Sequence, residues 1–162
     1  MKNLVVLLAL AAAAGPAVAQ TDPRQPAAQV APTRLPAAAV LLLGAIDVPL
    51  TEQGMARAGL TEPVAAAVLS DSSRSRYLRA RAVAAVARFR SPAGRALLER
   101  VAATDPDDEL RIQAVISLAR AFGPTDRPGV SAHLEALAHT APGPVRGVIG
   151  NELTRLHGPL AE

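Results

Sequence analysis

The sequence predicts an all-α protein, built as a short α-solenoid of about three stacked helix pairs with an irregular helical cap on its N-terminal side. Two observations support this prediction. Half of the residues are apolar but only 2% are aromatic, which favours closely packed helices over sheets. In addition, one pattern of apolar residues and arginine occurs three times with helical spacing.

The first 34 residues are expected to precede the folded domain. A basic residue, an apolar run and small residues before position 20 form the pattern of a signal peptide over residues 1–19. The alternative, a membrane anchor, is disfavoured because the apolar run is shorter than the roughly 20 residues of a span. Residues 20–34 read as a disordered linker and residues 158–162 as a tail. The sequence therefore predicts an exported protein, periplasmic or extracellular, with no membrane span after cleavage.

Residues 35–60 are expected to form the N-terminal helical cap. Two short helices, over 35–44 and 52–58, are predicted there, but neither fits the repeat. The apolar run 35–46 is too short to span a bilayer and contains Pro and Gly, so it is interpreted as a buried helix.

The first helix of each pair is expected to follow a capping residue and a proline. Thr61, Ser91 and Asp126 are good N-cap types, and each has a proline one or two residues further on. The three pairs are predicted at 61–90, 91–122 and 126–157.

The second helices carry the repeated pattern. An apolar residue followed by arginine opens each block, at Leu78, Leu110 and Val145, and further apolar residues follow four and eight positions later. Five residues before each of these openings stands a capping type, in turn Ser73, Asp105 and Thr140. Helices are therefore predicted over roughly 74–90, 106–122 and 142–157.

Residues 105–118, DPDDELRIQAVISL, resemble the second helix of a HEAT repeat. They are most similar to the short variety named after phycobilisome lyases, and the resemblance extends over about 61–157. Ser73 and Thr140 stand where that family has Asp, and Ile149 where it has Ala. The resemblance implies a scaffold whose second helices line a concave surface, and it implies little about activity.

Positive charge is concentrated in one part of the chain. Residues 74–100 contain eight arginines and one acid, Glu99, although the whole chain carries a net charge of only +3. The arginines form two series with the spacing of the repeat. The first arginine series consists of Arg79, Arg111 and Arg146. In the HEAT family this position pairs with acidic groups or loop carbonyls between repeats, which implies a structural role here. Asp105 is expected to be a structural residue between repeats as well.

The second arginine series, Arg88, Arg120 and Arg155, follows nine residues later, about half a turn round the helix. It is expected on a solvent-facing flank, and Arg74 and Arg81 are expected to extend it in steps of seven. Guanidinium groups in a row suit carboxylate or phosphate partners. These five arginines are the candidate partner-binding residues, and the alternative is an ordinary solvated face.

No catalytic residue, metal site or cofactor is predicted. The chain has no cysteine, and His133 and His139 are six residues apart, which does not suit a helical metal pair. The acidic run 105–109 fits a helix start better than a calcium loop. Nucleic acid is disfavoured because almost no aromatic residue is available for stacking.

The expected function is a non-enzymatic scaffold for protein–protein interaction, binding an acidic protein through the arginine-lined face as a monomer or weak oligomer. Two alternatives stay open. One is a lyase-like or cofactor-handling enzyme, by analogy with the family. The other is a purely structural spacer.

Overall fold

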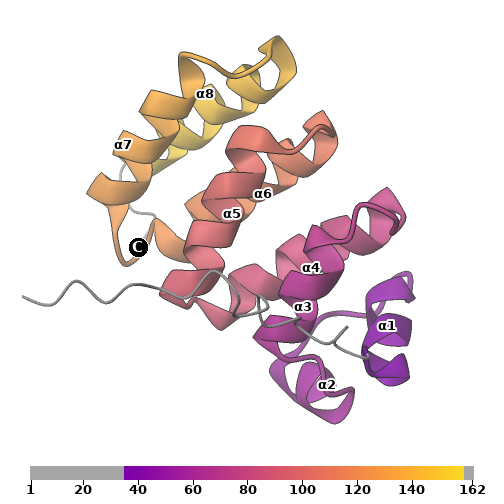
Figure 1. The fold of residues 1–162 in the computed structure, drawn as a ribbon. Coiled ribbons are helices and arrows are strands. Elements are labelled where there is room, and N and C mark those ends of the chain that lie inside the picture. Colours follow the sequence, from indigo (N-terminus) through magenta and orange to yellow (C-terminus); the bar gives the residue numbers. More distant parts are fainter. Residues whose placement is uncertain (1–34, 159–162) are drawn as a thin grey trace, which may run out of the picture. The chain divides into compact units, whose positions relative to one another are not determined.

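The computed structural model describes residues 35–158, which contain eight α-helices and no strand (Figure 1). The helices are α1 (Ala37–Gly44), α2 (Glu52–Arg57), α3 (Glu62–Ser70), α4 (Arg76–Phe89), α5 (Pro92–Thr104), α6 (Asp108–Phe122), α7 (Arg127–Ala138) and α8 (Gly143–His157). The predicted signal peptide, the linker and residues 159–162 of the tail lie outside the described residues.

Six helices form three consecutive pairs, α3 with α4, α5 with α6 and α7 with α8 (Figure 1). Neighbouring pairs meet mainly through their second helices, because α4 packs along α6 and α6 packs along α8. The first helices α3 and α5 touch each other much less. The predicted all-α solenoid is confirmed, and the second helices form its more tightly packed layer.

The repeated apolar pattern forms the core of this layer. In α6, Leu110, Ala114 and Leu118 are at most 1% exposed. The equivalent Val145 and Ile149 of α8 are also completely buried. Alanines at such positions allow the helix axes to approach closely, which compensates for the small number of aromatic side chains.

The start signals of the first helices are confirmed. Thr61, Ser91 and Asp126 are the N-cap residues of α3, α5 and α7. The Ser91 hydroxyl accepts from the Gly94 N–H at 2.9 Å, and the Asp126 carboxylate accepts from the Gly129 N–H at 3.1 Å. These bonds satisfy backbone donors that have no partner within the helix.

The expected starts of the second helices are wrong by one or two residues. The N-cap residues are Ser75, Asp107 and Pro142, in place of the predicted Ser73, Asp105 and Thr140. Asp105 instead ends α5, where its N–H donates to the Val101 carbonyl. The first two second helices are preceded by capping types at two positions, Ser73 and Ser75 or Asp105 and Asp107, and in the third pair Pro142 follows Thr140. The sequence pattern alone does not show which of the two positions is the N-cap and which belongs to the preceding turn.

The N-terminal cap consists of α1 and α2, and α1 packs against α4. Leu43 and Met55 extend the core of the stack into this cap. The prediction that the apolar run 35–46 is a buried helix holds in part: Ala39 and Leu43 of α1 are buried, but Leu41 is 74% exposed, and Ile46, equally exposed, lies beyond the end of the helix. Among residues 35–158, no helix is both long enough and apolar enough to cross a membrane.

Helix α8 forms although it contains three glycines, because its other side is buried in the core through Val145, Ile149 and Leu156. A Cβ atom built on Gly147 or Gly150 would meet no atom within 4 Å. These glycines therefore cost helix stability without giving room to a neighbour.

We expect Gly147→Ala and Gly150→Ala each to raise the free energy of unfolding by about 0.5–1 kcal/mol, because alanine restricts the unfolded chain and suits the helix. Urea denaturation would measure the change. Gly123→Ala is the contrasting variant, since its Cβ would lie 2.3 Å from the Ala119 carbonyl oxygen and 2.5 Å from Leu156. It should destabilise the protein by about 1–3 kcal/mol. Equal effects at these positions would contradict this account.

Candidate functional site

The first arginine series closes the helix pairs. The Nε atoms donate to carbonyls in the last turn of the preceding helix: Arg79 to Leu69 at 2.9 Å, Arg111 to Ala102 at 3.0 Å, and Arg146 to Ala138 at 3.1 Å. Carbonyls at a helix end lack intrahelical donors, so each guanidinium satisfies a group that would otherwise be unpaired. The three arginines thus occupy equivalent places in the three pairs.

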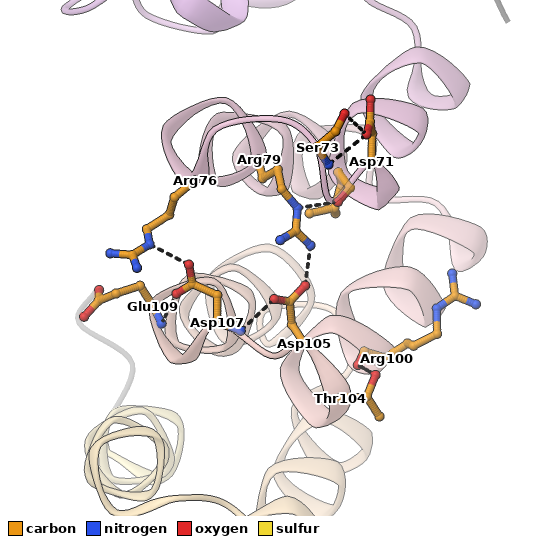
Figure 2. A network of polar contacts seen from close by, with 10 residues as sticks. Asp71, Ser73, Arg76, Arg79, Arg100, Thr104, Asp105, Asp107 and Glu109 are labelled. Atoms are coloured by element: carbon orange, nitrogen blue, oxygen red, sulfur yellow. Dashed lines mark hydrogen bonds and ion pairs between the residues drawn. The ribbon is translucent and has the colours of Figure 1, made fainter. Parts of the chain in front are cut away.

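Arg79 also connects two pairs. Its Nη2 forms an ion pair with Asp105, at the junction of α5 and α6, and the side chains are only 11% and 6% exposed (Figure 2). Beside it, Arg76 Nε lies 2.5 Å from an oxygen of Asp107 (Figure 2). The start of α4 is therefore held to the turn before α6 by two charged contacts.

The environment of Asp107 affects its ionisation. Partial burial opposes the charged form, but the hydrogen bonds from Arg76 and the Glu109 N–H outweigh it, so the pKa of Asp107 is lowered. The carboxylate is therefore held in the state that both the helix start and the ion pair require.

A similar contact joins the second and third pairs. Arg95 of α5 lies 2.6 Å from Asp126, the N-cap residue of α7. The hydrogen bond from Arg95, followed by that from the Gly129 N–H, lowers the pKa of Asp126 from its ordinary value of 3.8. Asp126 therefore combines a helix cap with a link between repeats.

The second arginine series lies on the exposed side of the second helices, but its members differ. Arg155 Nε is 2.7 Å from a carboxylate oxygen of Glu152, and Arg120 Nε is 4.0 Å from the other oxygen. The Glu152 side chain is only 9% exposed, so one buried carboxylate serves an arginine from α6 and one from α8. In the part of the chain that the structure describes, Arg88 has no carboxylate partner.

Two predicted members do not extend this series. Arg74 precedes α4 and forms an ion pair with Asp71 at 3.0 Å. Arg81 is half-buried, and its Nη2 donates to the Val48 carbonyl at 2.5 Å. The expectation that both arginines continue an exposed row was wrong, because α4 begins later than predicted and the N-terminal cap covers Arg81.

Arg88 and Arg120 line a groove of about 620 Å³ between α4 and α6, together with Arg90. We call it the arginine groove; it is lined by Arg88 and Arg90 of the first pair, by Arg120, Gln113 and Ser117 of α6, and by Glu52 at the start of α2, with small apolar side chains between them. Arg155, the last predicted partner-binding residue, is not among the lining residues. Glu52 is the one acid among these lining residues. The groove therefore has a surplus of positive charge.

Arg90 lines the groove but is not predicted as a site residue from the sequence. Arg90 ends α4 in the left-handed conformation, with φ of 50°, which non-glycine residues seldom adopt. Its position outside the helical periodicity hid it from a search for aligned arginines. The sequence feature that could have indicated Arg90 is an arginine at the end of a predicted helix, where a glycine would be favoured.

The three histidines do not come together in a metal site. In residues 35–158, no group of three His, Asp or Glu side chains is placed to hold a metal ion.

The architecture defines the class of protein: an α-solenoid of short helix pairs with arginine-closed ends. The family model for HEAT repeats matches residues 61–153, and the chain belongs to the HEAT-repeat family. The match begins at the cap of α3, so α1 and α2 lie outside it. No curated protein and no solved structure matches the chain. HEAT repeats are helical scaffolds that generally serve protein–protein interaction.

We expect Asp105→Ala to lower the free energy of unfolding by about 3 kcal/mol, because it leaves the buried Arg79 guanidinium without its carboxylate partner. Asp108→Ala is the matched control. Asp108 is 47% exposed and 3.6 Å from Arg111, so its loss should cost less than about 1 kcal/mol. Chemical denaturation of both variants tests the difference, and equal losses would refute the inter-repeat role.

The lowered pKa of Asp126 predicts an acid-sensitive link. Its contribution is fully present above the ordinary pKa of 3.8 and is lost as the pH falls through the lower pKa of the folded state. Asp126→Asn keeps a good capping residue but removes the titration. Between about pH 6 and about pH 3, its free energy of unfolding should therefore fall less than that of the wild type. Identical pH dependence in both proteins would disprove the link.

Proposed function

We propose that the protein is an exported, non-enzymatic interaction scaffold that binds an acidic protein partner through the arginine groove. The observation that carries this proposal is the surplus of guanidinium groups. Arg88, Arg90 and Arg120 line the groove with a single carboxylate. Within residues 35–158, neither Arg88 nor Arg90 forms an ion pair.

The chemistry of the groove favours binding over catalysis. Arginine stays protonated at all physiological pH values, so it cannot act as a general base. Its planar guanidinium recognises carboxylates through paired hydrogen bonds. The likeness to repeats of the phycobilisome-lyase type concerns the helices, and the lyase-like alternative would need a proton donor or nucleophile among the lining residues.

Export is supported by the N-terminal sequence pattern. A basic residue, an apolar run and small residues precede Gln20, as in cleaved signal peptides. An exported domain without cysteine depends on its core and its ion pairs for stability. The arginine groove is therefore proposed to meet its partner in the periplasm or outside the cell.

Binding to immobilised poly-glutamate tests the charge of the groove. We expect retention of the wild type at low ionic strength and release as salt rises, since exposed charges are screened over about 10 Å at 0.1 M salt. Arg88→Glu/Arg90→Glu should not be retained. The control Arg57→Glu/Arg100→Glu makes the same charge change at exposed positions that do not line the groove. Equal retention of both double variants would refute the proposal.

A further inference from the structure

An apolar hollow adjoins the arginine groove. It has a volume of about 390 Å³ and lies between the N-terminal cap and the end of α4. Its lining residues are Glu52, Met55, Ala56, Leu60, Thr61, Arg88 and Phe89. We propose that the hollow and the groove form one composite site for an acidic peptide segment in which an apolar side chain stands beside carboxylates. This inference rests on the proposed function and specifies its ligand.

The two parts share a boundary. Arg88 and Glu52 line both the apolar hollow and the arginine groove. A ligand that fills the hollow therefore lies next to the Arg88 guanidinium. Residues of an extended peptide are spaced about 3.3 Å apart and alternate in direction. One side chain can thus enter the hollow while carboxylates two positions away, on the same side of the peptide, reach the arginines.

The hollow is part of the folded core. Met55 is 4% exposed and Leu60 is 2% exposed, so the backbone and side chains around it are fixed by packing. Ala56 lies at its rim and is exposed, which leaves space for a side chain from outside. Because the hollow is preformed, the protein does not have to order its own side chains when a ligand binds, which lowers the entropic cost of binding.

Both parts together select a peptide over a simple anion. Phosphate or a polyanion without apolar groups would contact the arginines and leave the hollow filled with water. A peptide buries apolar surface there, which adds about 25 cal/mol for each Å² removed from water. Charge would then bring the segment to the groove, and the apolar residue would fix its register.

Arg90 supplies an independent argument for ligand binding at this site. It adopts φ of 50°, where glycine would be unstrained. The strained residue contributes a third guanidinium to the groove. Arg90→Gly should therefore yield a protein at least as stable as the wild type that binds the ligand less tightly. Loss of binding by a stabilised variant cannot result from misfolding.

Fluorescence anisotropy with labelled peptides tests the composite site. The reference peptide is a glutamate-rich decamer with one central leucine; a second peptide has alanine for leucine, and a third has glutamine for every glutamate. The protein variants are Ala56→Leu, which fills the hollow from its rim, Arg90→Gly, and Arg100→Ser as a control outside the site. Urea denaturation of each variant records its stability.

We expect the alanine peptide and the Ala56→Leu variant each to weaken binding about tenfold, as expected for losing most of the burial of one leucine side chain. Arg90→Gly should weaken binding severalfold without loss of stability, and Arg100→Ser should have no effect. Equal affinity for the leucine and alanine peptides would overturn the composite site while leaving the charge-based function intact. Equal affinity for the glutamine peptide would overturn both.

Discussion

Each helix pair is closed by a guanidinium that donates to the last turn of the preceding helix. This contact ties the start of the second helix to the end of the first helix of the pair. Arg79, Arg111 and Arg146 make it at equivalent places in the three pairs. The pairs stack through their second helices, and the core residues of α4, α6 and α8 belong to one hydrophobic cluster.

The same constraint determines which residues face outward. A residue nine positions after the closing arginine lies on the opposite side of its helix, so closing the pair turns the second arginine series toward solvent. Between α4 and α6, Arg88 and Arg120 then flank a groove. The N-terminal cap completes it on one side with Glu52 and provides the apolar hollow. The nine-residue spacing between the two arginine series thus places Arg88 and Arg120 at the groove, and the N-terminal cap adds Glu52 and the apolar hollow.

Periodic features could be predicted from the sequence, and positions set by chain ends could not. The helix pairs, the caps at Ser91 and Asp126 and the buried stripes follow from local chemistry that repeats. Arg81 was misplaced because its partner, the Val48 carbonyl, belongs to an irregular loop far away in sequence. Arg90 was missed because its importance arises from a backbone conformation rather than from a pattern. A contact with the N-terminal cap therefore explains Arg81, whereas Arg90 and the starts of the second helices depend on local backbone conformation at helix ends.

The carboxylate of Glu152 has a consequence for how the stack responds to its surroundings. It contacts Arg155 closely and Arg120 at 4.0 Å, and Arg120 also lines the groove. The same guanidinium therefore belongs both to the joint between α6 and α8 and to the surface between α4 and α6. Substitutions of Arg120 therefore perturb two places at once, whereas substitutions of Arg88 leave the contacts of Glu152 intact.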